Sequence, residues 1–256
     1  MMRIVVKVGS AVLAHNDSLA FDRMGNLVNF LAELKKNNEV VLVSSGAVAA
    51  GYTKIQLDRS VITNKQALAS IGQPVLMHTY AEKFSKHNII ISQVLVTAAN
   101  LSKVQEINKI KNTVDTLISN GVLPIINEND ATTTDELEVG DNDQLSAYIT
   151  KHIDADMLII LSDIDAYYDK DPRKNTDAKI LKIVNSIDKK DLDKNATPHG
   201  TFATGGIVTK LKAASYLLNN NIDTFLATGF DLKDIQSYLL DENHIGGTLF
   251  TNKGAK

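Results

Sequence analysis

The chain has 256 residues, of which 44% are hydrophobic and 22% are charged, and its net charge is −3 at pH 7. This length and composition provide for a hydrophobic core of normal size, in one large domain or two small ones. The slight negative charge argues against a broad surface for nucleic acid or anionic membranes, because either partner requires an excess of basic residues.

Cysteine is absent from the sequence, which excludes disulfides, thiolate nucleophiles and thiolate metal ligands. Residues 1–9 contain no basic segment followed by an apolar stretch, so we expect no signal peptide. No uninterrupted apolar run approaches the roughly 20 residues of a membrane helix. We therefore predict a cytoplasmic protein with no membrane partner and no nucleic-acid partner.

Short segments rich in valine and isoleucine recur along the chain. These apolar runs are Arg3–Val8, Val40–Val43, Ile89–Val94, Val122–Ile126, Met157–Leu161 and Thr224–Ala227. Several of them are apolar at nearly every position, which is typical of strands buried on both faces of a parallel sheet. We predict a strand at each run.

The longer stretches between the runs have helical spacing of their apolar residues. The predicted helices are Asp22–Lys36, Lys103–Ser119 and Ile207–Asn219. Gly121 and Asn221 fall where the second and third of these helices should end. Strands that alternate with helices predict an α/β sandwich.

Two polar segments interrupt this alternation. Ala131–Asp141 is interpreted as a hairpin or as a loop that covers a substrate, and Tyr167–Thr201 as an excursion from the sandwich. Neither segment is interpreted as a linker between domains.

The first candidate site is Lys7, which lies inside an apolar run and is followed by Gly9 and Ser10. An unpaired ammonium group is costly in such surroundings, so Lys7 either extends to solvent or faces a bound anion. The spacing alone does not separate these two interpretations. The segment is not a Walker A loop, because no GxxxxGK[ST] pattern is present.

A second candidate is the group of small residues Ser44, Ser45 and Gly46, which follows an apolar run and precedes an apparent helix. The first N–H groups of that helix could bind a carboxylate or a phosphate. The alternative is an ordinary tight turn with a serine cap.

Two clusters of carboxylates and amides form the third candidate, Ile126–Asp130 and Val139–Asp143. Acidic groups can hold an α-ammonium, amides can orient a carboxylate, and one aspartate can orient a lysine. A Mg²⁺ site is the competing use of these oxygen ligands, and a solvated loop would explain either cluster alone.

The last two candidates follow the same logic of strand ends and helix starts. Ser162 and Asp163 come at the end of a predicted strand, where ligands bind in open α/β sheets. Gly205 and Gly206 open a predicted helix, and Lys210 lies one turn inside it, which supplies N–H donors and a cation for one anion. The alternative is a glycine turn with a surface lysine.

Taken in this order, the segments KVGS, SSGAVAAG, INENDAT, VGDNDQLSA and ATGGIVTK resemble the glutamate 5-kinases of the amino acid kinase superfamily. The resemblance runs from about Arg3 to Phe250. It implies one αβα sandwich around a mainly parallel sheet of about eight strands, spanning residues 1–256, without the RNA-binding-like PUA domain that many members carry.

The resemblance also implies an activity and its ligands. The expected reaction is phosphorylation of the γ-carboxylate of L-glutamate by ATP, with Mg²⁺ bound to the ATP, giving glutamyl 5-phosphate as the first step of proline biosynthesis. Proline as a feedback inhibitor and a homodimer or homotetramer are further expectations from the family.

Residue roles follow from the same resemblance. Lys7 and Lys210 match the two phosphate-binding lysines, and Asp143 matches the aspartate that organises them. The residues that match glutamate-binding positions are Ser45, Asp130 and Asn142. The residues that match nucleotide-binding positions are Lys7, Ser162, Asp163, Thr204, Gly205, Gly206, Ile207, Val208, Thr209 and Lys210. No protein residue is implied as a metal ligand.

Ala166 and Ile207 depart from the family pattern, which often has glycine and methionine there, but neither position supplies a required charge. The main alternative is a sister kinase acting on N-acetylglutamate, aspartate, carbamate or UMP. N-acetylglutamate has no α-ammonium, so the acidic character of Asp130 favours free glutamate. A non-catalytic sensor of nucleotide or amino acid is the second alternative, against which the two lysines argue.

Overall fold

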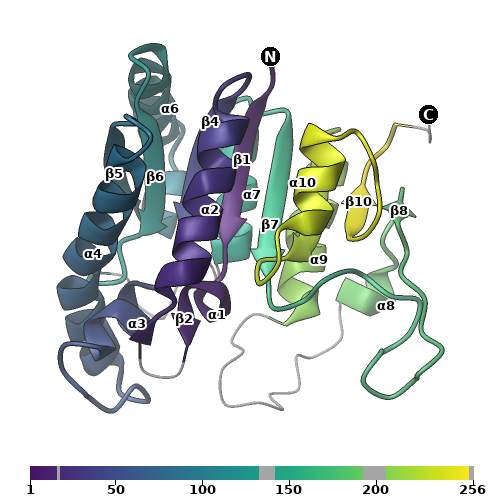
Figure 1. Cartoon of the computed structure of the whole chain (residues 1–256), viewed down its shortest axis with the longest axis horizontal. Helices are drawn as coiled ribbons and strands as arrows, with labels where there is room; N and C mark the ends of the chain where they lie inside the picture. The colour runs from purple at the N-terminus through teal and green to yellow at the C-terminus, as the bar shows by residue number, and fades with distance from the viewer. Residues whose placement is uncertain (16–17, 133–141, 193–205, 254–256) are drawn as a thin grey trace.

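Segments rich in valine and isoleucine form the centre of the computed structural model, which describes residues 1–15, 18–132, 142–192 and 206–253 (Figure 1). The eight strands of the main sheet are β1 (Arg3–Val8), β4 (Glu39–Ser44), β5 (Ile91–Val96), β6 (Leu123–Glu128), β7 (Met157–Ser162), β8 (Ile183–Val184), β9 (Asp223–Thr228) and β10 (Thr248–Phe250). Their order is β5-β6-β4-β1-β7-β9-β10-β8. All neighbouring pairs are parallel except β9 and β10, so the predicted, mainly parallel sheet is confirmed.

Helices cover both faces of this sheet, which confirms the αβα sandwich. One face packs against α2 (Phe21–Leu34), α4 (Ile62–Ser85) and α10 (Lys233–Leu240), which lie in front of the sheet in Figure 1. The other face packs against α6 (Val104–Ser119), α7 (Asn142–His152) and α9 (Ile207–Leu218). Shorter elements are α1 (Ser10–Leu13), β2 (Ala14–His15), β3 (Ser18–Leu19), α3 (Ala47–Tyr52), α5 (Ala98–Leu101) and α8 (Lys189–Leu192).

The alternation of side chains along β1 decides which layer each residue faces. Ile4, Val6 and Val8 pack in the layer of α2 and α4, whereas Val5 packs in the layer of α7 and α9. Because the side-chain period of a strand is two, Lys7 points to the same side as Val5. The strand pattern therefore directs the Lys7 ammonium toward α7 and α9.

All six predicted strands are present, but most of their predicted ends differ from the observed ones, by at most two residues. The run Ile89–Val94 predicts a strand two residues too early, because β5 begins at Ile91. Asn88 has φ +56°, and the Ile89 N–H donates to the Phe84 carbonyl oxygen at 3.2 Å, so Ile89 belongs to the turn that closes α4. The predicted helix ends at Gly121 (φ +75°) and Asn221 (φ +56°) are confirmed.

The carboxyl ends of the parallel strands lie at the lower edge of the sheet in Figure 1, toward which the arrows of β1 and β7 point. Ser45 follows β4 at this edge, and Ser162 is the last residue of β7. Helices α7 and α9 begin at the same edge. In the part of the chain that the structure describes, no helix combines the length and apolar character needed to cross a membrane.

Helices α3 and α4 approach each other closely through two glycines. A Cβ atom at Gly72 would lie 1.8 Å from the Ala47 carbonyl oxygen and 2.3 Å from the Gly51 nitrogen. A Cβ atom at Gly51 would lie 1.9 Å from the Leu68 carbonyl oxygen. Only glycine permits this backbone contact, which places α4 directly against the turn that follows β4.

Replacing Gly72 by alanine tests the importance of this contact. We expect Gly72→Ala to lower the free energy of unfolding by about 1–3 kcal/mol, because the two helix backbones must separate. The matched control is Gly25→Ala in the interior of α2, where the nearest heavy atom to a Cβ is Lys83 Nζ at 3.7 Å. In that control the free energy of unfolding should rise by about 0.5–1 kcal/mol, because alanine has a higher helix propensity than glycine. Urea denaturation measures both changes. Equal stabilities of the two variants would show that the contact at Gly72 does not matter for stability.

Candidate active site

A buried cluster of one carboxylate and two ammonium groups lies at the carboxyl edge of the sheet. Lys7 Nζ donates to Asp143 Oδ1, and Lys210 Nζ donates to Asp143 Oδ2 at 3.0 Å. The exposed fractions of Lys7, Asp143 and Lys210 are 4%, 0% and 3%. The interpretations of Lys7 as a solvent-directed lysine and of Lys210 as a surface lysine are therefore wrong.

The surroundings of Asp143 stabilise its ionised form. Burial by itself raises the pKa of this carboxyl, but the charges of Lys7 and Lys210 and the hydrogen bonds outweigh burial and lower the pKa to about 2. Thr209 Oγ1 contributes one of these bonds, at 2.8 Å from Asp143 Oδ2. Asp143 is thus a fixed anion that holds two lysines from distant parts of the chain.

The predicted phosphate-binding segment around α9 is described from Gly206 onward, and Thr204 and Gly205 lie outside the described residues. Gly206 precedes the helix, and Ile207, Val208, Thr209 and Lys210 form its first turn. A Cβ atom at Gly206 would meet no atom of the described residues within 4 Å, so this part of the chain leaves open space beside the helix start.

Ser162 and Asp163 lie at the end of β7, beside the turn that follows β1. Ser162 Oγ donates to Asp163 Oδ1 at 2.8 Å. The preceding residue, Leu161, accepts a hydrogen bond of 2.9 Å from the Gly9 N–H, which joins the end of β7 to the turn after β1. The predicted strand-end segment is therefore beside the Lys7 segment.

A chain of polar side chains extends from the Asp143 cluster toward α4. Asn142 Nδ2 donates to Ser45 Oγ at 2.8 Å and to Asn127 Oδ1 at 3.2 Å. Asn127 Nδ2 in turn donates to Gln73 Oε1 at 2.9 Å. The structure thus brings together Ser45 and Asn142, as predicted, and adds Gln73 to the group. Gln73 was not a candidate because it lies in α4, a helix that the apolar pattern did not predict.

The turn after β4 differs from the serine-cap alternative. The residue before α3 is Gly46, whose φ of +101° lies in the left-handed region that favours glycine. Among the described residues, no side chain caps this helix start. The glycine conformation, rather than a serine cap, therefore shapes the turn that carries Ser45.

A cavity of about 270 Å³ opens beside this polar chain. It is lined by Ala47, Ala69, Ser70, Gln73, Pro74, Gln93, Leu95, Glu128, Asn129, Asp130 and Ala131. Burial raises the pKa of Asp130 to about 6. Asp130, predicted to bind the substrate, therefore lies in a cavity wall where a cationic group would stabilise its charge.

The competing interpretation of the acidic clusters as a metal site finds little support in the described residues. Among them, no group of three or more histidine, aspartate and glutamate side chains is close enough to hold a metal ion. Asp143 contacts two ammonium groups, and such surroundings repel a divalent cation. Residues 139–141 of the second cluster lie outside the described part of the chain.

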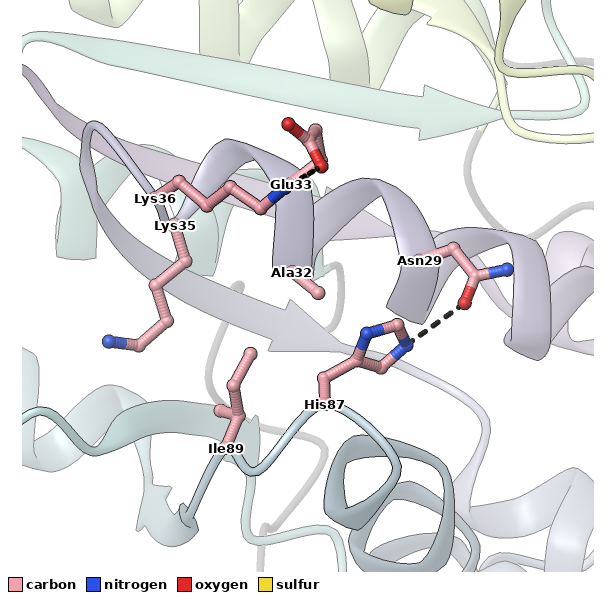
Figure 2. A pocket seen from close by; sticks show the side chains of 7 residues that line it. All are labelled: Asn29, Ala32, Glu33, Lys35, Lys36, His87 and Ile89. Carbon is pink, nitrogen blue, oxygen red and sulfur yellow. Dashed lines mark hydrogen bonds and ion pairs between the residues drawn. The ribbon is translucent and has the colours of Figure 1, made fainter.

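A second cavity, of about 310 Å³, lies between α2 and the turn before β5 (Figure 2). Figure 2 shows Lys36 paired with Glu33 and His87 paired with Asn29, at 2.6 Å and 3.0 Å. These four side chains are exposed, and the cavity lies at the amino ends of β4 and β5, away from Lys7. We therefore do not assign the candidate chemistry to it.

Known proteins resemble this chain over most of its length. Residues 2–228 match the family model described as the amino acid kinase family. The chain is 49% identical over 259 residues to a glutamate 5-kinase of Wolinella succinogenes, and the match covers 99% of both chains. A glutamate 5-kinase of Leishmania donovani is 49% identical over 251 residues, which is 98% of this chain and 95% of the relative.

The likeness of fold extends to more distant proteins. A solved structure of isopentenyl phosphate kinase superposes with a TM-score of 0.69 at 16% sequence identity, covering 97% of this chain and 100% of that one. At this identity the likeness shows the fold alone. Together with the family model and the two relatives, it establishes that the chain belongs to the amino acid kinase family.

Proposed function

We propose that the protein transfers the γ-phosphoryl group of ATP to the γ-carboxylate of L-glutamate, forming glutamyl 5-phosphate, the first step of proline biosynthesis. The observation that carries this proposal is the convergence of Lys7 and Lys210 on the two oxygens of Asp143. The names of the two relatives at 49% identity support glutamate as the acceptor. Inhibition by proline, a homodimer or homotetramer, a cytoplasmic location and a single domain stay predictions from the family resemblance.

In this proposal the lysines offset the repulsion between two anions. Phosphoryl transfer requires mainly positioning and charge neutralisation from the protein. The nucleophile is a carboxylate that is already ionised near pH 7, so no general base is needed. Lys7 and Lys210 would flank the phosphoryl group as it moves, and Asp143 would hold both ammonium groups in place.

The nucleotide would bind between the start of α9 and the end of β7. Thr204 to Lys210 would supply backbone N–H groups and the Lys210 ammonium to the phosphates, and Ser162 and Asp163 would lie beside them. Mg²⁺ would enter with ATP and neutralise phosphate charge, with phosphate oxygens and water as its ligands. We assign no protein ligand to this ion.

The acid substrate would occupy the cavity lined by Asp130. The half-buried carboxylate of Asp130 suits the α-ammonium of an amino acid, and Ser45 and Asn142, which bond to each other beside the Asp143 cluster, would provide further polar contacts to the acid. N-acetylglutamate, the substrate of the main alternative, lacks this ammonium group and would leave Asp130 unpaired. Asp130 therefore favours free glutamate.

ATP consumption with a panel of acids tests the acceptor. Purified protein is incubated with ATP, Mg²⁺ and either L-glutamate, N-acetylglutamate or aspartate, and the acyl phosphate is trapped as a hydroxamate. We expect product with L-glutamate alone. Product only with N-acetylglutamate would replace the proposal by the sister activity, and no product with any acid would favour a sensor.

Lys210→Ala tests the phosphate-binding role. We expect kcat to fall about 10²–10³-fold, the usual effect of removing one preorganised donor to a transition state. The matched control is Lys212→Ala, which removes an exposed lysine from the same helix and should leave kcat unchanged. Thermal melts establish the folded fraction of each variant, and wild-type kcat in folded Lys210→Ala would contradict the assignment.

Asp130→Asn should separate substrate binding from stability. Because the folded-state pKa of about 6 lies above the unfolded value of 3.8, the ionised carboxylate destabilises the fold above about pH 6. We expect Asp130→Asn to stabilise the protein by about 1–3 kcal/mol near pH 7.5, and to lose this gain at about pH 4. Thermal or urea unfolding at both pH values measures the change.

The same variant should bind glutamate poorly. In the wild type, kcat/KM for glutamate should fall about tenfold per pH unit below about pH 6, as Asp130 becomes protonated. Asp130→Asn should have a raised KM and lack this step, whereas Glu242→Gln at an exposed position should behave as the wild type. An unchanged glutamate KM would remove Asp130 from the pocket.

A further inference from the structure

Four side chains from four separate elements form one continuous hydrogen-bonded chain, here called the amide chain: Gln73, Asn127, Asn142 and Ser45. They belong to α4, β6, α7 and the turn after β4. The exposed fractions of Gln73, Asn127 and Ser45 are 9%, 2% and 7%. Strands β6 and β4 are neighbours in the sheet (Figure 1). The amide chain therefore crosses the carboxyl edge from α4 to α7.

A backbone group fixes the direction of this amide chain. The Glu128 N–H donates to Asn127 Oδ1 at 2.9 Å, and a backbone N–H cannot act as an acceptor. Asn127 must therefore keep its oxygen toward Glu128 and its Nδ2 toward Gln73, which accepts with Oε1. The same oxygen of Asn127 requires that Asn142 present its Nδ2. The orientation of each amide thus follows from its neighbour.

With this direction of the hydrogen bonds, Ser45 and Asn142 each have one polar group that is not used within the amide chain. Ser45 Oγ accepts from Asn142 Nδ2, so the Ser45 proton is available to a carboxylate oxygen. Asn142 Oδ1 is buried and has no hydrogen-bond partner among the described residues, which leaves an acceptor that suits an ammonium group. An amino acid carries both complementary groups.

Gln73 is the anchor of the amide chain on the cavity side. It lines the same cavity as Asp130, and the close contact at Gly72 holds this part of α4 against α3. Gln73 Nε2 is buried without a partner in the described part of the protein, although such a donor usually costs about 1–3 kcal/mol. The hydrogen bond that Gln73 Oε1 accepts from Asn127 is the interaction that can offset this cost.

We propose that Gln73 is a positioning residue for the acid substrate: its Oε1 orients Asn127 and, through it, Asn142 and Ser45. The Glu128 N–H decides which end of the Asn127 amide faces it, and Gln73 Oε1 holds the other end. Without this acceptor Nδ2 has no partner and the amide is held at one end only, so Asn142 and Ser45 lose part of their support. The role rests on the proposed function, since the ligand that Ser45 and Asn142 face is the amino acid.

Kinetics of Gln73→Met test this role, because methionine keeps the size of the side chain and removes the acceptor. We expect the glutamate KM to rise about 3–30-fold, the range for losing one oriented hydrogen-bond network, while the KM for ATP stays unchanged and kcat stays within about threefold. Gln236→Met on α10 is the matched control and should have wild-type constants. An unchanged glutamate KM in folded Gln73→Met overturns the role.

A double-mutant cycle with Asn142→Ala shows whether Gln73 acts through the amide chain. If it does, the glutamate KM of the double variant equals that of Asn142→Ala alone, because the orientation no longer matters. Two independent effects that multiply would mean that Gln73 acts by another route, and would overturn the proposal.

A second variant distinguishes the role of Gln73 Oε1 from that of Nε2. It also provides a test if Gln73→Met does not fold. Gln73→Glu keeps an acceptor for Asn127 and replaces the Nε2 donor, so we expect a glutamate KM within about threefold of wild type. A rise as large as that caused by Asn142→Ala would overturn the positioning role. Absence of glutamate-dependent hydroxamate with the wild type would instead refute the proposed function itself.

Discussion

The buried carboxylate of Asp143 between two lysine ammonium groups is the interaction on which the candidate site depends. Burying any of these charges alone would cost several kcal/mol, so the three side chains must lie together or not be buried at all. The alternation along β1 supplies the geometry, since it turns Lys7 toward the layer of α7 and α9. Asn142, the neighbour of Asp143 in the first turn of α7, connects this cluster to the amide chain.

The sequence predicted those parts of the molecule that have a local signal. Buried strands have runs of valine and isoleucine, and α2, α6 and α9 have clear apolar spacing, so the sheet and three of its helices were predictable. The predicted start of β5 was wrong because the isoleucines begin already in the turn that closes α4. Gln73 could not be found this way: α4 mixes buried residues with exposed Ile62 and Ile71, and a hydrogen bond across 54 positions leaves no local pattern.

Groups that local rules disfavour gather on the acid side of the site. Asp130 is ionised near pH 7 in spite of its partial burial, and Asn142 Oδ1 is buried with no hydrogen-bond partner among the described residues. Each feature lowers the stability of the ligand-free protein. Concentration of such unfavourable groups is expected where binding of a ligand supplies the missing partners.

The two halves of the site therefore differ in how far they are complete before any ligand binds. In the half that would bind phosphate, Lys7, Lys210 and Thr209 all bond to Asp143, so its cations are held in place beforehand. In the half that would bind the acid, complementary groups await an ammonium and a carboxylate. An isopentenyl phosphate kinase shares this fold at 16% identity, so the fold alone does not select the acceptor. Selection must come from side chains of the second half, among them Asp130 and the residues that Gln73 orients.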